Sequence, residues 1–211
     1  MIKYLFQGDS ITDANRVDED EGQGSCLFGY GYPILFASDV LRNNKGKYEF
    51  INRGISGDRI VDVYARIKED IINLKPDIMS ILIGVNDVWH ELSVQNGVDS
   101  AKFEKIYSML IEEIKEALPE IKIIILEPFV QYGTGTQMYY DVFRKDVEEK
   151  AVAAKRIADK YNLSFVPLQK EFDEAASDGD TAYWTTDGVH PTAAGHQLIK
   201  EELLKAFNKI V

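Results

Sequence analysis

The sequence predicts an α/β fold, a three-layer α/β/α sandwich whose central layer is a five-stranded parallel sheet. Short apolar segments alternate along the chain with longer amphipathic segments, which is typical of a sheet covered by helices on both faces. Two of the short segments, residues 77–83 and 121–126, are apolar at almost every position. Such strands are buried on both faces, as the central strands of a parallel sheet are.

The five expected strands follow the short apolar segments in chain order. We place them at residues 2–7, 48–52, 77–83, 121–126 and 164–166. The first three are each followed closely by a glycine, namely Gly8, Gly54 and Gly84. Ligands of open parallel sheets bind outside the carboxyl ends of the strands, so we expect the functional residues in the turns at these glycines.

The five expected helices occupy the amphipathic segments. We place them at residues 33–42, 59–74, 100–118, 139–161 and 192–208. In the second of these segments Ile67, Ile71 and Leu74 recur at helical spacing, and the third segment repeats this spacing from residue 103 to residue 114. Pro76 and Pro119 follow these two helices, where a proline marks a turn.

Length and composition predict one globular domain that spans residues 1–211. A chain of 211 residues can bury a substantial core, and we find no repeat, low-complexity tract or linker that would divide it. Its net charge of −11 repels phosphate backbones and anionic lipid. We therefore expect neither nucleic acid nor a membrane as a partner, while a homo-oligomer remains open.

The sequence also bears on where the protein works. Cys26 is the single cysteine, so no internal disulfide is needed. A signal peptide does not fit before Gly8, and no apolar run has the length of a transmembrane helix. We expect a cytoplasmic protein.

Two compact motifs at opposite ends of the chain predict a hydrolytic triad. Ser10 lies in Gly-Asp-Ser-Ile-Thr after the first strand, and His190 lies in Asp-Gly-Val-His-Pro before the last helix. A serine hydroxyl is a poor nucleophile at neutral pH unless an imidazole removes its proton. Asp187 can fold back across a turn to hold the second ring nitrogen of His190 and stabilise the imidazolium.

Two further turns supply donors for an oxyanion hole. Acyl transfer places negative charge on the carbonyl oxygen of the tetrahedral intermediate, and hydrogen-bond donors must already point at it. Gly57 has no Cβ to keep its backbone N–H from a ligand, and Asn86 offers an amide that does not titrate. The backbone N–H of Ser10 completes the expected hole.

Each of these motifs also has a purely structural interpretation. Gly-Asp-Ser is a common turn after a strand, and Asp-x-x-His often forms a surface turn. Gly57 could open a helix, and Asn86 could form an Asx-turn. Together, however, the motifs supply every role that an acyl hydrolase requires, and we favour the catalytic interpretation.

Other notable residues receive weaker predictions. Tyr30, Trp89 and Trp184 flank the motifs and could line the substrate site, although aromatic residues more often pack in the core. His90 could line the acyl pocket or cap its loop, and Glu127 could contact substrate or help to start a helix.

We assign structural roles to the remaining candidates. His196 is expected on the last helix, and Asp9 and Asp87 are expected to accept backbone N–H bonds that shape their turns. No paired metal-ligand motif and no nucleotide-binding glycine motif occurs, so we expect no metal and no organic cofactor.

In their order and local contexts, Ser10, Gly57, Asn86 and His190 resemble the four signature blocks of the SGNH hydrolases, also called the GDSL esterase/lipase family. The resemblance implies Ser10 as nucleophile, Gly57 and Asn86 as oxyanion donors, and His190 as base with Asp187 as its orienting partner. It also implies a flavodoxin-like sheet of strand order 2-1-3-4-5. That order places the loop of Ser10 at the point where the chain reverses direction.

The extended motifs at residues 8–13, 53–57 and 84–89 are similar to those of the cytoplasmic acetylxylan esterases of this family. The similarity implies a small-molecule ester as substrate and the removal of acetyl groups from xylo-oligosaccharides or related sugars. A broad carboxylesterase, a lysophospholipase or an acyl-thioesterase of the same family remains an alternative. A carbohydrate-binding module without catalysis is a further one, although no catalytic element is broken.

Overall fold

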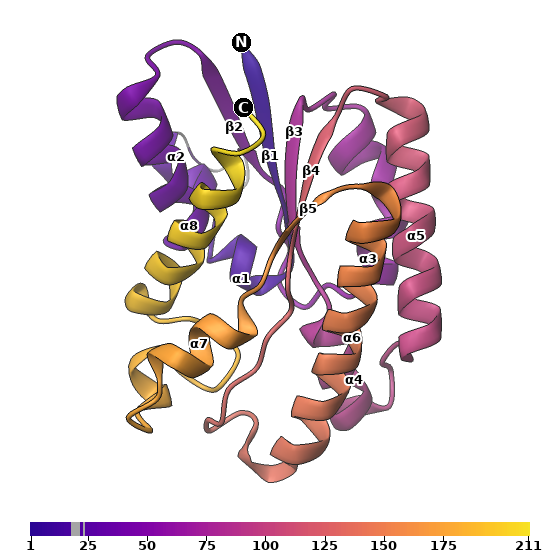
Figure 1. Cartoon of the computed structure of the whole chain (residues 1–211), viewed down its shortest axis with the longest axis vertical. Helices are drawn as coiled ribbons and strands as arrows, with labels where there is room; N and C mark the ends of the chain where they lie inside the picture. The colour runs from indigo at the N-terminus through magenta and orange to yellow at the C-terminus, as the bar shows by residue number, and fades with distance from the viewer. Residues whose placement is uncertain (18–21, 23) are drawn as a thin grey trace.

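A five-stranded sheet forms the centre of the computed structural model, which describes residues 1–17, 22 and 24–211 (Figure 1). The strands are β1 (Ile2–Gly8), β2 (Tyr48–Asn52), β3 (Ile78–Leu82), β4 (Lys122–Leu126) and β5 (Ser164–Val166). They lie in the order β2-β1-β3-β4-β5, and all four neighbouring pairs are parallel. The predicted fold class and strand order are confirmed, and each strand lies within one residue of its predicted bounds.

Helices cover both faces of this sheet because successive strand side chains point to opposite sides. Tyr4 and Phe6 of β1 pack into one hydrophobic cluster with helices α2 (Tyr32–Asn43) and α8 (Ala193–Phe207). Leu5 packs into the second cluster, on the other face, with the helices named next. These are α3 (Ile60–Ala65), α5 (Ser100–Ala117) and α6 (Tyr140–Tyr161). Figure 1 shows the two helical layers to the left and right of the strands.

The segment predicted as one helix over residues 59–74 is broken, and this prediction was wrong. Helix α3 ends at Ala65, and a wider π-helical turn, η2 (Lys68–Ile72), follows. Arg66 leaves helical geometry with φ −105°, and the Asn73 N–H donates to the carbonyl of Lys68, five residues back, at 2.9 Å. The break lets the Arg66 guanidinium contact carboxylates on both of its sides, which an uninterrupted amphipathic pattern does not reveal.

Three short helices were not predicted. They are α1 (Ser10–Asp13), α4 (Val85–Val94) and α7 (Gln169–Ala175). The 3₁₀ turns η1 (Gly24–Phe28), η3 (Gln137–Tyr139) and η4 (Thr181–Tyr183) complete the described elements. The segment between β5 and residue 186, where we predicted neither a helix nor a strand, contains α7 and η4. Helices of one to three turns offer few apolar positions from which a periodicity could be recognised.

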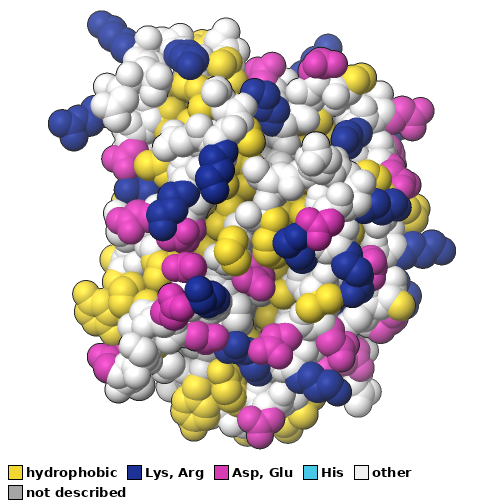
Figure 2. Space-filling model, viewed as in Figure 1, with side chains coloured by type: hydrophobic (Ala, Val, Ile, Leu, Met, Phe, Trp, Pro, Cys, Tyr) yellow, Lys and Arg dark blue, Asp and Glu magenta, His cyan; other side chains and the backbone are white. Residues whose placement is uncertain are grey.

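Both chain termini lie at the end of the sheet where β1 begins, and the carboxyl ends of the strands face the opposite end (Figure 1). On the visible face of the molecule acidic and basic side chains are interspersed, and hydrophobic side chains gather near the lower edge (Figure 2). The exposed hydrophobic residues of the segments after β4 and β5 include Tyr132, Met138, Tyr139 and Tyr183. None of the helices in the described part of the chain is both long and apolar enough to cross a membrane.

Candidate active site

The loop after β1 presents Ser10 at the start of a helix. A Cβ on Gly8 would lie 2.4 Å from the carbonyl oxygen of Leu82 and from Oγ1 of Thr12, so only glycine allows this close approach to β3. The buried Asp9 side chain then caps α1, because its Oδ1 accepts the N–H of Ile11 at 3.0 Å. The predicted turn-forming role of Asp9 is confirmed.

Ser10, His190 and Asp187 form a continuous hydrogen-bonded chain. Ser10 Oγ lies 2.9 Å from His190 Nε2, and His190 Nδ1 lies 2.7 Å from Asp187 Oδ2. Ser10 and His190 are separated by 180 positions in the sequence, and they meet at the carboxyl ends of the strands. A histidine with one ring nitrogen on a carboxylate and the other on a hydroxyl is arranged to take the hydroxyl proton.

The loop of Asp187 and His190 is fixed by its own backbone. Asp187 Oδ1 accepts the N–H groups of Val189 and His190 at 2.9 and 2.8 Å. The Thr186 N–H donates to the His190 carbonyl at 2.8 Å, which closes the loop. The second carboxylate oxygen is thereby left for the imidazole, and the ring is held in one orientation.

A segment that the sequence analysis overlooked supports this loop from the side of β4. The Gln131 N–H donates to the Gly188 carbonyl at 2.7 Å, and the Gly135 N–H donates to the Asp187 carbonyl at 2.8 Å. A Cβ on Gly133 would lie 2.3 Å from Asp187 backbone carbon, so the two segments are in close contact. The glycines at 133 and 135, in the segment that follows the buried strand β4, were the available signal.

Electrostatics favour proton transfer to His190. The hydrogen bond with Asp187 raises the pKa of His190 above its usual value, although partial burial acts in the opposite direction. Burial also raises the pKa of Asp187, but the hydrogen bonds from the His190 ring and from two backbone N–H groups outweigh it and lower that pKa to about 2. Asp187 is therefore ionised at neutral pH, and it stabilises the imidazolium.

The two expected oxyanion donors come from the loops after β2 and β3. Gly57 adopts φ +89°, a left-handed conformation that favours glycine, and a Cβ built there meets open space. The Asn86 Nδ2 group donates to the Asp58 carbonyl at 3.1 Å, so one of its two N–H bonds fixes the amide and the other remains for a ligand. Both oxygens of the Asp87 carboxylate accept the N–H of Ile60, each at 3.2 Å, as the predicted turn-forming role requires.

Of the expected substrate-lining aromatic residues, the structure brings Trp89 to the histidine. The Trp89 ring lies 5.8 Å from the His190 ring, and it lines a cavity of about 170 Å³ with Tyr139 and Phe143. Tyr30 is 66% exposed, and its ring lies 6.2 Å from that of His196. Trp184 is half-buried and packs against the core cluster that contains Tyr4 and Phe6.

The histidines and Glu127 take separate positions. His90 lies inside α4, one helical turn after Asn86, and is half-buried. His196 is buried in α8, where its Nδ1 accepts the Tyr32 N–H at 3.2 Å and burial lowers its pKa to about 4, as expected of a structural group. Glu127 Oε2 accepts the N–H groups of Leu168 and Gln169 at 2.7 and 2.9 Å. Glu127 thus caps α7, which favours the helix-starting interpretation.

No group of three or more His, Cys, Asp or Glu side chains that could hold a metal ion occurs among residues 1–17, 22 and 24–211.

Comparison with known proteins matches the chain to one family and to solved structures. Residues 6–198 match the GDSL-like Lipase/Acylhydrolase family. The acetylxylan esterase of Geobacillus stearothermophilus is 35% identical over 96% of this chain and 92% of its own length. A GDSL-like lipase from Parabacteroides merdae superimposes with a TM-score of 0.90 at 34% identity, over 98% of this chain and 95% of that one. A variant of an acetyl-xylooligosaccharide esterase from Geobacillus superimposes with a TM-score of 0.86 at 32% identity. The match covers 97% of this chain and 93% of that one.

Proposed function

The chain belongs to the GDSL-like lipase/acylhydrolase family and is a carboxylic ester hydrolase, and we propose that it removes acetyl groups from xylo-oligosaccharides or related sugars, with Ser10 as nucleophile. One observation carries this proposal. Ser10 Oγ lies 2.9 Å from His190 Nε2, while Asp187 holds the opposite ring nitrogen at 2.7 Å.

The first half of the reaction acylates Ser10. As Oγ attacks the ester carbonyl, His190 Nε2 takes the hydroxyl proton, and Asp187 stabilises the resulting imidazolium. The tetrahedral intermediate then collapses, and the imidazolium gives its proton to the leaving alcohol oxygen. The products of this half-reaction are the free alcohol and an acetyl ester on Ser10.

Three donors stabilise the negative charge of the tetrahedral intermediates. In the proposal these are the backbone N–H groups of Ser10 and Gly57 and the free N–H of the Asn86 amide. Ser10 is the first residue of α1, although a helix of four residues adds little dipole of its own. The contribution of the donors lies in their fixed positions, since they need no rearrangement as charge develops.

The second half of the reaction releases acetate. His190, again neutral, removes a proton from a water molecule that attacks the acetyl carbonyl, and it then returns the proton to Ser10 Oγ. The same donors stabilise the second tetrahedral intermediate. Every proton moves between Ser10, His190, the alcohol and water, so the cycle closes without a metal or an organic cofactor.

The sugar assignment rests on the relatives and on the surroundings of His190. The alcohol leaves toward His190 Nε2, so the sugar is expected on the side of the imidazole. Trp89 lies 5.8 Å from that ring, and its cavity also contains Tyr139, whose exposed aromatic side chain suits stacking on a sugar ring. The relatives described as acetylxylan and acetyl-xylooligosaccharide esterases support the same substrate class.

A substrate profile tests this proposal. We expect kcat/KM for 4-nitrophenyl esters to fall steeply from acetyl to octanoyl, and we expect acetate release from acetylated xylo-oligosaccharides. The Ser10→Ala variant should be inactive toward all of them. A profile that peaks at octanoyl, without acetate release from the sugars, would overturn the sugar assignment in favour of a carboxylesterase, lysophospholipase or acyl-thioesterase. Such a profile would not contradict the proposed roles of Ser10, His190 and Asp187.

A further inference from the structure

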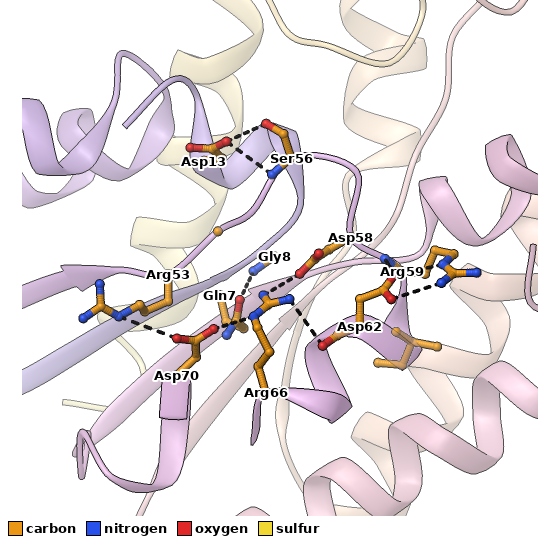
Figure 3. A network of polar contacts seen from close by, with 12 residues as sticks. Gln7, Gly8, Asp13, Arg53, Ser56, Asp58, Arg59, Asp62, Arg66 and Asp70 are labelled. Carbon is orange, nitrogen blue, oxygen red and sulfur yellow. Dashed lines mark hydrogen bonds and ion pairs between the residues drawn. The ribbon is translucent and has the colours of Figure 1, made fainter. Parts of the chain in front are cut away.

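A loop of seven residues, 53–59, joins β2 to α3 and contains Gly57; we call it the oxyanion loop. Its first half is tied to the segment of the proposed nucleophile. The Ile55 N–H donates to the Gly8 carbonyl at 3.0 Å, and the Ser56 hydroxyl and N–H donate to Asp13 Oδ2 at 2.5 and 3.2 Å. Figure 3 shows the Asp13 and Ser56 pair at one end of a larger polar network.

In the second half of the oxyanion loop, one arginine, Arg66, holds the carboxylate of Asp58. Arg66 Nη2 donates to Asp58 Oδ2 at 2.5 Å, and Arg66 Nε donates to Asp70 Oδ2 at 2.6 Å. The remaining nitrogen, Nη1, reaches the carbonyl of Asp62 at 3.3 Å. Figure 3 shows the Arg66 guanidinium between Asp58 and Asp70. All three guanidinium nitrogens are thus used, and the broken helix places Arg66 where it can bridge both carboxylates.

The network is shielded from water. Side-chain exposure is 24% for Arg66, 8% for Asp58 and 11% for Asp70. Charges that are largely buried interact more strongly than they do on an open surface. A buried carboxylate that loses its cationic partner lowers the stability of the folded protein. Asp58 directly follows Gly57, and its carbonyl accepts the Asn86 amide at 3.1 Å. The position of Asp58 therefore affects both expected donors.

We propose that Arg66 is a positioning residue for ester hydrolysis: it fixes Asp58, and with it the oxyanion loop, and it cancels a negative charge next to the oxyanion hole. This inference rests on the proposed function. A tetrahedral intermediate carries its negative charge at the hole, so an uncompensated Asp58 carboxylate would repel it. The ground-state ester is neutral, and the effect therefore falls mainly on kcat.

Four variants test the role of Arg66 with 4-nitrophenyl acetate as substrate. We expect Arg66→Met to lower kcat by about 10- to 100-fold with KM within about threefold, less than the loss of a whole donor. Arg66→Lys keeps the charge but cannot bridge two carboxylates, so it should recover part of this loss. Asp58→Asn should lower kcat only a few-fold. The double variant with Arg66→Met and Asp58→Asn should be faster than Arg66→Met alone, because no bare carboxylate remains.

Arg144→Met is the matched control. Arg144 also bridges two carboxylates, Glu148 at 2.6 Å and Asp173 at 2.8 Å, and its side chain is 23% exposed. Arg144 lies on α6, and its remaining contact is the Val130 carbonyl at 3.4 Å, so none of its three partners belongs to the oxyanion loop. We expect a smaller fall in melting temperature than in Arg66→Met, because Glu148 and Asp173 are 54% and 44% exposed, and we expect kcat within twofold of the wild type.

Several outcomes would overturn the inference. These are an unchanged kcat in Arg66→Met, a change in KM alone, an equal kcat loss in Arg144→Met, or a double variant slower than Arg66→Met. If Arg66→Met does not fold, Arg66→Lys and the double variant decide the question by the same comparison. A wild type that hydrolyses no ester would instead refute the proposed function, so the two failures are distinguishable.

Discussion

The Asn86 amide donates a 3.1 Å hydrogen bond to the carbonyl of Asp58, the residue that follows Gly57. This contact joins the loop after β2 to the first turn of α4, which follows β3. The Asp87 carboxylate strengthens the junction, because it accepts the N–H of Ile60 at the start of α3. The two expected oxyanion donors therefore belong to one rigid unit rather than to two independent loops.

Gly57 and Gly179 form a natural pair for testing the oxyanion hole. Both have φ +89°, and a Cβ at either position meets open space. Replacing either with alanine should lower the free energy of unfolding by about 1–2 kcal/mol, since alanine disfavours this conformation. Only Gly57→Ala should also lower kcat, because the strained backbone would turn the N–H of residue 57 away from the oxyanion. Equal kcat values in the two variants would remove Gly57 from the hole, and denaturant unfolding with steady-state kinetics measures both effects.

Asn86→Ala removes a donor and also the bond to Asp58. Loss of one oxyanion donor typically lowers kcat by about 10²- to 10³-fold, and we expect a loss of that size with a smaller change in KM. Steady-state kinetics on 4-nitrophenyl acetate gives both constants. An unchanged kcat would show that the amide has only its structural bond.

Asp187→Asn tests the electrostatic role of the carboxylate. The base must be neutral to accept a proton, so wild-type kcat/KM should fall as pH drops through the pKa of His190. Because Asp187 raises that pKa, the fall should be centred above the usual histidine value of about 6.5. In Asp187→Asn the pKa of His190 should be lower, and kcat should fall by roughly 10⁴-fold as the wrong tautomer is held.

The pKa of His190 in both proteins can be read directly from the pH dependence of its ring-proton NMR signals. A pKa that does not move in Asp187→Asn would contradict the assigned cause, whatever the change in rate.

Glu127→Ala distinguishes the two roles considered for this residue. The carboxylate accepts two N–H groups at the start of α7, so its loss should lower the free energy of unfolding by about 1–2 kcal/mol. We expect kcat and KM to stay within twofold of the wild type. Asp99→Ala, which removes the N-cap of α5, is a suitable comparison. A several-fold rise in KM at unchanged stability would indicate a substrate contact instead.

The strands were predictable because buried parallel strands are apolar on both faces, and a sheet of this kind places its loops at one edge. β2 and β5 have the predicted bounds. The long helices α5 and α6 were also predicted to within one residue, since each keeps an apolar stripe over many turns. Residues Ser10, Gly57, Asn86 and His190 could be singled out because each lies next to a turn that ends a strand or precedes a helix.

Other features depend on contacts that local sequence does not encode. The break at Arg66 is linked to carboxylates at positions 58 and 70, eight and four residues away, whose directions are set by the fold. The support of Asp187 by Gly135 joins segments about fifty residues apart. The placement of Trp89 beside His190 and of Tyr30 beside His196 depends likewise on how their loops pack. An aromatic residue beside a motif has the same sequence signature in either place.

The central claim is that Ser10 carries the acetyl group during turnover, and trapping the acetyl-enzyme tests it most directly. The wild type is mixed with 4-nitrophenyl acetate, quenched in acid within the first turnovers, digested and analysed by peptide mass spectrometry. We predict one added acetyl group on the tryptic peptide of residues 4–16, assigned to Ser10 by fragmentation, and none in Ser10→Ala, which should also lose hydrolysis by roughly 10⁴-fold or more. An acetyl group on another residue, or turnover that persists in Ser10→Ala, would contradict the account.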